Sequence, residues 1–334
     1  MRISLSSIRE DKPGPKWQAR FEAYWPEYRE WFLSEGYLAR PGYVPSVKML
    51  RRYVPELMPV YDELVELAGG GDLAARFLSL YRPPPYALGC SQAVWPGRDP
   101  ALVRNYDYSP NLFEGTLLFT SWCRPVIAMG DCMWGVLDGI NDAGLAVSLA
   151  FGGSRTVGDG FGIPLILRYI LEFCEDVEEG SEVLRRVPVH MPYNVTLVDR
   201  AGAFSTVYVC PGRAAAVTDS PVGTNHQQRV ESEDYARMTS TVERERYMGS
   251  RLADANETRS GFIGRFLRPP LHNTRYEQAF GTLYTAAYFP RDLAAEYYWP
   301  RRATLRQSFS NFEEKDMVIH LKPLRPSFKT RTVS

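Results

Sequence analysis

Three consecutive prolines, Pro83-Pro84-Pro85, divide the sequence into two parts with different patterns. Before them, aromatic and charged residues recur at helical spacing over 17–34, 46–67 and 73–81. Proline fixes φ and donates no backbone hydrogen bond, so the segment around the triplet is extended and helix-free. The pattern predicts a helical N-terminal segment over residues 1–89, ending in a proline-rich linker, and a second domain over residues 90–334.

Apolar runs of strand length dominate the sequence after the linker. Turn residues such as Asn141-Asp142-Ala143-Gly144 separate some of these runs, whereas 164–173, 181–187 and 234–253 have helical character. Strands are expected over 91–95, 103–108, 117–122, 126–129, 135–140, 145–151, 195–198, 204–209, 282–289 and 294–299. This order of elements predicts an α+β fold in which sheets stack face to face with helices outside, rather than a doubly wound parallel sheet.

The charges of the chain balance, with 39 lysines and arginines against 39 aspartates and glutamates. No net field therefore attracts nucleic acid or an anionic membrane. The first residues turn polar at once, unlike a signal peptide, and the apolar range 163–171 is too short to span a bilayer. Five cysteines without regular spacing form no disulfide framework. These features predict a cytoplasmic protein without nucleic-acid or membrane partners.

A glycine–cysteine pair, Gly89-Cys90, stands between the linker and the first expected strand. A lone cysteine is most often a small buried hydrophobic residue. If the bond before Cys90 were cut, however, Cys90 would carry a thiol and a free α-amine, which together make a complete acyl-transfer nucleophile. An α-amine has a pKa of about 7.7–8.0, so a useful fraction is neutral near pH 7 and can accept a proton.

Three further motifs follow this pair: Arg-Asn-Tyr-Asp at 104–107, Gly-Ile-Asn-Asp-Ala-Gly-Leu at 139–145 and Thr-Asn-His at 224–226. In this order the motifs resemble the N-terminal nucleophile (Ntn) hydrolases, which include isopenicillin-N acyltransferase and, more distantly, bile salt hydrolase and acid ceramidase-like amidases. The resemblance covers residues 86–299 and implies a four-layer αββα sandwich. It also implies a precursor that cuts its own Gly89–Cys90 bond, after which Cys90 attacks amides or thioesters.

The resemblance assigns catalytic roles to three more residues. Arg104 is expected beside the nucleophile, where its charge would lower the pKa of the Cys90 thiol, and Asp107 is expected to hold the α-amine. Positions three apart in a strand face opposite sides, so both reach one site only if the strand bends or ends there. Asn225 is expected to donate its side-chain amide to the oxyanion. Without Cys90, the same residues are typical of a surface ion pair and a turn.

Other residues are candidates for a supporting role. Tyr106, His226 and Arg275 are expected as substrate contacts or as supports around the site, and His226 is not needed as a base because the amine serves as one. Family members carry an asparagine near the end of the strand after the Gly-Leu turn, whereas residues 147–151 read Val-Ser-Leu-Ala-Phe. One oxyanion donor is therefore missing or is replaced by a backbone N–H. The histidines lack metal-ligand spacing, and no metal or other cofactor is predicted.

The resemblance thus implies an autoproteolytically activated cysteine amidohydrolase or acyltransferase that acts on a small acyl amide or acyl thioester. The sequence leaves open whether water or an amine resolves the Cys90 acyl-enzyme. The aromatic residues of the N-terminal segment need burial, which favours a cleaved segment that stays docked. Two alternatives remain: an unprocessed papain-like hydrolase that pairs Cys90 with His226, and a non-catalytic binding protein on the same fold.

Overall fold

Two β-sheets form the centre of the molecule. The computed structural model describes residues 1–86, 89–278 and 280–321. In these residues the larger sheet contains, from edge to edge, β10 (Arg213–Thr218), β9 (Phe204–Cys210), β8 (Tyr193–Val198), β7 (Ala146–Phe151), β6 (Gly135–Asn141), β5 (Val126–Asp131), β4 (Thr116–Thr120), β1 (Arg2–Glu10) and β15 (Lys315–His320). The smaller sheet contains β11 (Val222–Gly223), β2 (Gly89–Trp95), β3 (Ala101–Tyr108), β12 (Gly281–Phe289), β13 (Ala294–Tyr298) and β14 (Leu305–Ser308).

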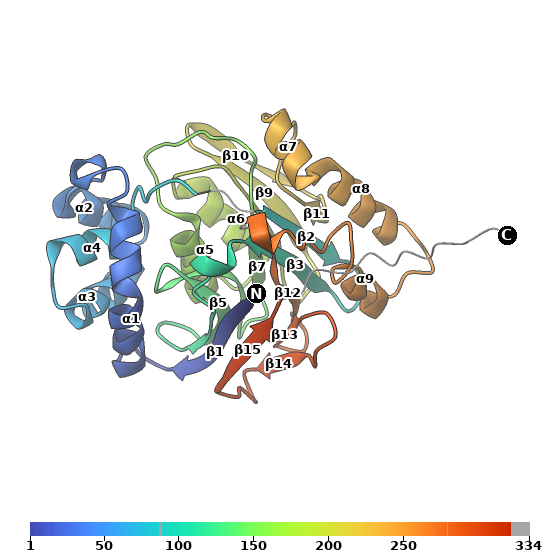
Figure 1. Cartoon of the computed structure of the whole chain (residues 1–334), viewed down its shortest axis with the longest axis horizontal. Helices are drawn as coiled ribbons and strands as arrows, with labels where there is room; N and C mark the ends of the chain where they lie inside the picture. Colours follow the sequence, from blue (N-terminus) through green and yellow to red (C-terminus); the bar gives the residue numbers. More distant parts are fainter. Residues whose placement is uncertain (87–88, 279, 322–334) are drawn as a thin grey trace.

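The helices comprise an N-terminal group, which lies on one side of the molecule in Figure 1, and helices that follow later strands in the sequence. The N-terminal group consists of α1 (Pro15–Phe32), α2 (Tyr43–Tyr53), α3 (Met58–Leu67) and α4 (Asp72–Leu78). The later helices are α5 (Ile163–Phe173), α6 (Val177–Arg186), α7 (Glu233–Thr239), α8 (Thr241–Leu252) and α9 (Arg259–Arg265).

The sheets and helices form four layers. β2 and β3 pack on β7 and β8 of the larger sheet, and β13 packs on β6. On the outer side of the larger sheet, α5 covers β5 to β7 and α6 covers β8 to β10, whereas α8 lies against β2 and β11 of the smaller sheet. The order helix, sheet, sheet, helix confirms the predicted αββα sandwich of the α+β class.

Helix α5 is buried on almost every side. Ten of its 11 residues are buried, because the helix packs on the larger sheet and α6 and also contacts the N-terminal segment. The hydroxyl of Tyr169 donates to Glu56 at 3.0 Å, and the ring of Tyr53 packs on Phe161 just before the helix. The N-terminal group therefore adds a layer outside part of the sandwich.

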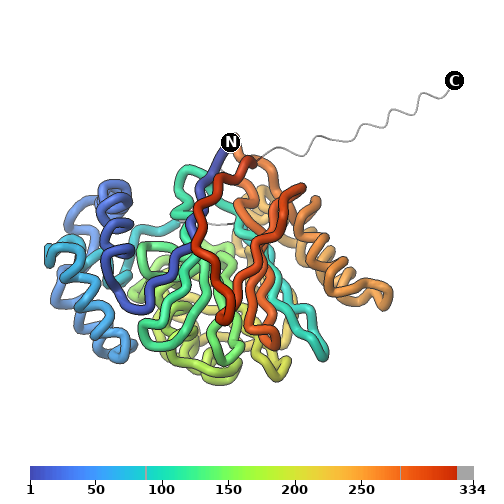
Figure 2. Tube along the Cα trace, turned by 90° about the horizontal axis from the view of Figure 1, so that it is seen from below, coloured from blue at the N-terminus to red at the C-terminus, as the bar shows by residue number. Residues whose placement is uncertain are grey.

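The first strand corrects one expectation from the sequence. The N-terminal segment is helical over much of 15–78, as predicted, but Arg2–Glu10 form β1 instead of helix. β1 runs parallel to β4 and antiparallel to β15, so it is hydrogen-bonded on both sides (Figure 2). Ile3 and Leu5 alternate with exposed residues and enter the core, as in a half-buried strand. The domain boundary at residue 89 stays a prediction.

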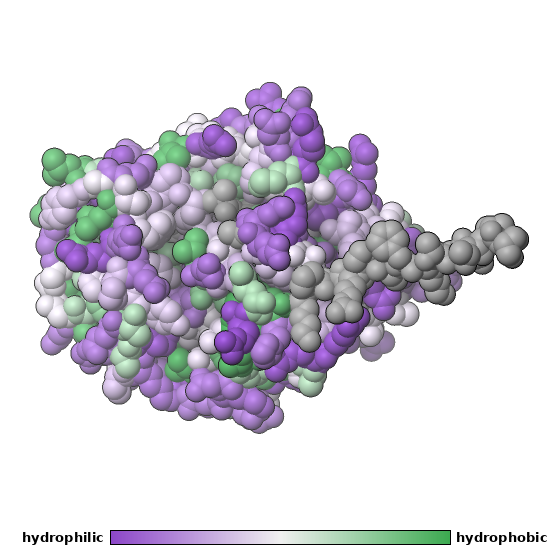
Figure 3. All heavy atoms as spheres, viewed as in Figure 1, coloured by the Kyte–Doolittle hydropathy of each residue, from purple (hydrophilic) through white to green (hydrophobic). Residues whose placement is uncertain are grey.

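The surface drawn in Figure 3 is largely hydrophilic, and hydrophobic residues appear on it in small separate groups. Single exposed apolar side chains such as Leu38 are common on soluble domains. No helix in the part of the chain that the structure describes is long and apolar enough to cross a membrane.

Removal of one buried side chain tests whether β1 packs into the core. Leu5→Ala is expected to lower the free energy of unfolding by about 2–5 kcal/mol, because the Leu5 side chain is buried and its loss leaves a cavity. Leu38→Ala is the matched control, since Leu38 is 92% exposed, and a change below about 0.5 kcal/mol is expected. Chemical denaturation measures both values. Equal effects of the two substitutions would contradict the packing of β1.

Candidate active site

Cys90 lies near the start of β2, next to β3, the strand that carries the Arg-Asn-Tyr-Asp motif. In the register of the smaller sheet, Gly89 pairs with Asp107 and Cys90 pairs with Tyr106 of β3. Residues directly opposite in an antiparallel pair point to the same face, so Tyr106 and the buried Cys90 are neighbours. A Cβ atom on Gly89 would lie 2.0 Å from the ring of Phe280. Any side chain before Cys90 would therefore displace that ring.

The sulfur of Cys90 contacts a buried guanidinium. Nη2 of Arg104 lies 3.0 Å from Sγ, and Nη1 of the same side chain forms an ion pair with Asp138 of β6 in the other sheet. The hydroxyls of Tyr284 and Tyr288 also donate to the Asp138 carboxylate, the former at 2.5 Å. A buried charge is tolerated only with such partners. Arg104 therefore connects the sulfur to the facing sheet.

The environment of Cys90 has opposing effects on the pKa of its thiol. Burial raises the pKa of the thiol above its usual range, whereas the nearby charge of Arg104 lowers it. The carboxylate of Asp107 raises the same pKa, and the backbone N–H of Asp107 and the charge of Arg244 lower it. Because burial is the largest effect, Cys90 is a protonated thiol near neutral pH and needs a base to become a nucleophile.

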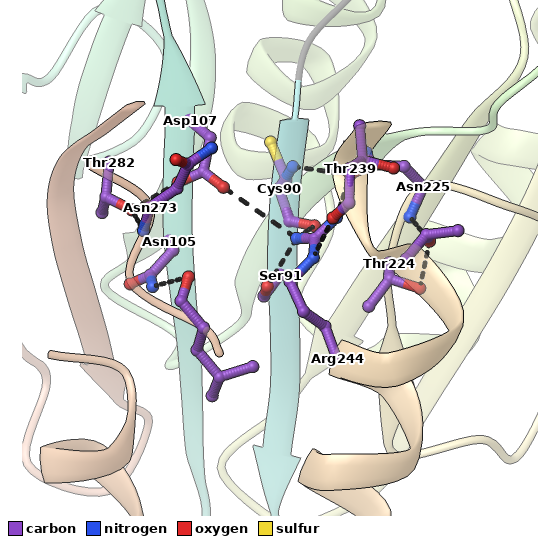
Figure 4. Close-up of polar contacts among 12 residues, drawn as sticks. Cys90, Ser91, Asn105, Asp107, Thr224, Asn225, Thr239, Arg244, Asn273 and Thr282 are labelled. Atoms are coloured by element: carbon purple, nitrogen blue, oxygen red, sulfur yellow. Dashed lines mark hydrogen bonds and ion pairs between the residues drawn. The ribbon is translucent and has the colours of Figure 1, made fainter. Parts of the chain in front are cut away.

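Asn225 and Arg244 hold the backbone around Cys90 (Figure 4). The N–H of Cys90 donates to Oδ1 of Asn225 at 2.9 Å, and Nη2 of Arg244 donates to the same oxygen at 2.7 Å. Nη1 of Arg244 donates to the carbonyl of Cys90 at 2.6 Å and to Oγ of Ser91 at 2.7 Å. The nitrogen and the carbonyl of Cys90 are therefore both fixed by side chains.

The orientation of Asn225 bears on its expected role. Two donors fix its Oδ1, and its Nδ2 donates to the carbonyl of Phe151 at 3.2 Å. In this uncut chain the side-chain oxygen thus accepts from the nitrogen of Cys90. The role of the amide group as an oxyanion donor stays a prediction.

Asp107 lies on the opposite face of β3 from Arg104, as their three-residue spacing requires. Its Oδ1 accepts a hydrogen bond from Oγ1 of Thr282 at 2.6 Å, and its Oδ2 lies 3.9 Å from Nη1 of Arg244 on α8. Burial raises the pKa of Asp107 to about 6, although the charge of Arg244 and the Thr282 hydrogen bond act to lower it. Arg104 and Asp107 therefore approach Cys90 from the two faces of the smaller sheet, without a break in β3.

Tyr106 and Arg275 lie on different sides of this centre. The guanidinium of Arg104 stands 5.0 Å from the centroid of the Tyr106 ring, so Tyr106 shares the sulfur side of the sheet. Arg275 donates to the carbonyl of Met238 at 2.6 Å and to Oδ1 of Asn273 at 3.2 Å. The charge of Arg275 acts to lower the pKa of Asp107, so Arg275 influences the face of the smaller sheet that α8 covers.

His226 is held by groups of α8. Its Nδ1 lies 2.9 Å from Oγ1 of Thr241, and its Nε2 lies 3.2 Å from the carboxylate of Glu245. These contacts fit the expected orienting or packing role. They do not favour the papain-like alternative, because the sulfur of Cys90 contacts Arg104 and the His226 ring is engaged elsewhere.

Two buried side chains around Cys90 escaped the sequence analysis. Arg244 belongs to a helix rich in charges, but Thr241, Arg244 and Met248 form its buried face at helical spacing. Asp138 stands within the apolar range 135–140, and a carboxylate in such a strand signals a buried partner. Both signals are present in the sequence, although neither identifies the partner.

A family model described as acyl-coenzyme A:6-aminopenicillanic acid acyl-transferase matches residues 95–304, a range that contains Arg104, Asp107 and Asn225 and begins after Cys90. No curated protein matches the sequence.

Solved structures with a similar arrangement share little sequence with the chain. Penicillin V acylase from Agrobacterium tumefaciens aligns with a TM-score of 0.46 and 14% identity, over 66% of this chain and 86% of that one. A mutant of conjugated bile acid hydrolase from Clostridium perfringens gives 0.45 and 12%, over 68% and 96%. The Caenorhabditis elegans ortholog of N-acylethanolamine-hydrolyzing acid amidase gives 0.44 and 16%, over 69% and 100%.

The raised pKa of Asp107 predicts a pH-dependent loss of stability. The folded protein holds this proton more tightly than the unfolded chain, whose aspartates have a pKa of about 3.9. Ionisation of Asp107 therefore costs stability as the pH rises from about 4 to about 6. Asp107→Asn lacks this cost. When it is added to Cys90→Ala, in which Cys90 keeps its amide nitrogen, stability relative to Cys90→Ala alone should rise by about 1–3 kcal/mol between pH 4 and pH 7.

Urea denaturation at a series of pH values measures this difference. Asp234→Asn is the matched control, because the side chain of Asp234 is 97% exposed and its removal should leave the pH profile unchanged. A difference between the Cys90→Ala chains with and without Asp107→Asn that does not vary with pH would contradict the raised pKa.

Proposed function

Because the chain belongs to the acyl-coenzyme A:6-aminopenicillanic acid acyl-transferase family, we propose that it is a cysteine amidohydrolase or acyltransferase that activates itself by cutting the Gly89–Cys90 bond. The environment of Cys90 carries the proposal. Its sulfur lies 3.0 Å from the Arg104 guanidinium, and the nitrogen of the bond to be cut is held 2.9 Å from Asn225. Neighbouring side chains thus hold both the sulfur and the backbone nitrogen of Cys90, the two atoms that take part in self-cleavage.

Self-cleavage begins with attack of the Cys90 thiol on the carbonyl carbon of Gly89. The Gly89–Cys90 C–N bond breaks, the thiol proton passes to the nitrogen of Cys90, and a thioester links Gly89 to Sγ. Water then hydrolyses the thioester, which frees the thiol and leaves a carboxylate on Gly89. Glycine suits this position for two reasons. Phe280 occupies the space that a side chain would need, and without a side chain residue 89 does not shield its own carbonyl carbon.

Turnover uses the α-amine that cleavage creates. The amine takes the proton of the buried thiol, Sγ attacks the acyl carbonyl of a small amide or thioester, and the protonated amine returns the proton to the leaving group. Arg104 stabilises the thiolate, Asp107 holds the amine, and Asn225 turns its amide group to the oxyanion. Water then completes hydrolysis, or an acceptor amine completes acyl transfer.

The intact mass of the purified protein tests the proposal. Wild type should consist of two fragments, residues 1–89 and 90–334, because the thiol cuts the bond before it. Cys90→Ala should remain one chain, since it has no nucleophile. Cys174→Ala is the matched control: Cys174 is also a buried free cysteine, lies outside the site, and should leave cleavage intact.

An uncut wild-type chain without turnover would overturn the proposal, and so would two further results. One is a wild-type protein that stays whole yet hydrolyses acyl amides, because that enzyme would need a base other than the α-amine. The other is cleavage at the same bond in Cys90→Ala, because a contaminating protease would then be the agent.

We also propose that the cleaved N-terminal segment stays docked. β1 is paired with β4 on one side and β15 on the other, and both partners belong to the second fragment. Arg20 of α1 forms a buried ion pair with Glu114, and a buried pair is costly to break. Cleavage of one bond at Gly89 removes none of these contacts.

Helix α1 also supports the loop between β5 and β6. Cys132 and Met133 in this loop have φ angles of +53° and +70°, a conformation that side chains disfavour. The Tyr28 hydroxyl accepts from the N–H of Cys132 at 3.0 Å, and the Trp17 indole donates to the carbonyl of Met133 at 3.1 Å. Loss of α1 would remove these supports from a strained loop.

Docking predicts that the two fragments migrate as one particle. On size-exclusion chromatography at neutral pH, residues 1–89 should co-elute with residues 90–334 and should separate only in denaturant. Trp17→Ala should weaken this association because Trp17 is buried, whereas Tyr37→Ala should not, because Tyr37 is 54% exposed. Native mass spectrometry counts the fragments. A folded second fragment that has lost the first would contradict docking.

A further inference from the structure

A cavity lies between helix α1 and the smaller sheet, beside the candidate active site. Tyr24, Tyr28 and Trp31 of α1 form one wall, and Tyr106 and Tyr108 of β3 form another. Tyr106 is the register partner of Cys90, so one wall of the cavity is formed by the neighbour of Cys90, although Cys90 itself does not line it. Its volume is about 110 Å³. A cavity of roughly 150 Å³ can hold benzene, so this space suits a compact group rather than a long chain.

The charged groups that line this cavity are acidic. Glu27, Glu114 and Asp131 line it, and no lysine, arginine or histidine does so in the described residues. Glu114 is neutralised by its buried ion pair with Arg20. Asp131 has no ion-pair partner within the described ranges, and burial together with the charge of Glu114 raises its pKa to about 7. The cavity therefore contains a carboxyl group that lacks a cation.

The aromatic walls add to this electrostatic preference. The face of an aromatic ring carries partial negative charge and attracts cations, and several rings around one space form a cage for alkylammonium groups. Tyr28, Trp31, Tyr86 and Tyr108 surround the cavity from different segments of the chain. Rings alone also pack against neutral groups, so a second feature is needed to favour a cation. The Asp131 carboxyl accepts a hydrogen bond from the Cys132 thiol but forms no ion pair among the described residues, and its ionised form would be stabilised by a cation rather than by a neutral group.

The position of Tyr86 indicates which part of a substrate enters. In the thioester of self-cleavage, residues up to Gly89 are the acyl group on Cys90, and Tyr86, three residues before Gly89, already lines the cavity. The cavity therefore lies on the acyl side of the nucleophile. We propose that it binds a compact positively charged nitrogen, an alkylammonium or quaternary ammonium group, on the acyl part of the substrate; this assignment rests on the proposed function.

Binding of two probes of equal shape tests the cation site without catalysis. Choline and 3,3-dimethyl-1-butanol differ only in the exchange of a charged nitrogen for carbon. Titration calorimetry on full-length Cys90→Ala is expected to show choline binding at least about tenfold tighter than the neutral alcohol. Asp131→Asn in the same chain should abolish most of this difference and leave the affinity for the alcohol unchanged. Equal affinities, or no choline binding, would overturn the proposal.

Two further variants guard this test against an effect on folding. Trp31→Leu removes one aromatic wall on a helix surface and should weaken choline binding severalfold, while it leaves the Asp131 carboxyl in place. Asp159→Asn is the matched control, because Asp159 is an exposed carboxylate that pairs with Arg82 away from the cavity, and it should bind choline like the parent. Choline binding unaffected by both Asp131→Asn and Trp31→Leu would place the cation elsewhere and overturn the proposal.

A pair of substrates then tests the acyl-side assignment. The p-nitroanilides of 4-(trimethylammonio)butanoic acid and 5,5-dimethylhexanoic acid have the same shape, and the first should show at least about tenfold higher kcat/KM with the cleaved wild-type enzyme. Asp131→Asn should bring the ratio close to one. Equal or faster turnover of the neutral anilide would overturn the cation site but not the proposed function.

The remaining outcomes separate the two proposals. Choline binding without turnover of either anilide by a cleaved enzyme would overturn the acyl-side assignment. An uncut wild-type chain without turnover would overturn the proposed function, and the acyl-side assignment with it.

Discussion

The guanidinium of Arg104 is the contact on which the candidate site depends. It lies in the interior, where an unpaired charge would cost several kcal/mol, and it is kept there by the Asp138 carboxylate of the facing sheet. Its other end contacts the sulfur of Cys90. The packing of the two sheets therefore fixes the position of the Arg104 guanidinium relative to the sulfur. In this way the packing of the sandwich influences the pKa of the Cys90 thiol.

The N-terminal segment is bound into the same packing. β1 closes a gap in the larger sheet between β4 and β15, and α1 buries Arg20 against Glu114. The proposed cut at Gly89 is therefore compatible with a stable fold, because hydrogen bonds and buried contacts connect the two parts in addition to the peptide bond. It also makes the first part of the chain a wall of the cavity beside Tyr106.

The layered fold could be predicted because apolar strands and turn residues alternate clearly between residues 91 and 299. The sequence analysis missed β1, in which serines and arginines dilute the alternation of Ile3 and Leu5, and it missed the more polar β10, β14 and β15. In the site, motifs identify Arg104 and Asp107, but not Arg244. Helical spacing with Thr241 and Met248 indicates that Arg244 is buried, but only the tertiary contact with the Cys90 carbonyl shows that it belongs to the site.

Different groups contact the sulfur and the backbone of Cys90 on the two faces of the smaller sheet. The sulfur lies on the inner face with Arg104, whereas Asp107 and Arg244 meet on the outer face and Arg244 reaches the backbone of Cys90. Burial keeps the thiol protonated, so the charge of Arg104 alone does not make a nucleophile. An amide nitrogen cannot take the proton, but an amine at the same place can. The outer-face groups that now hold the backbone of Cys90 would then also set the basicity of that amine.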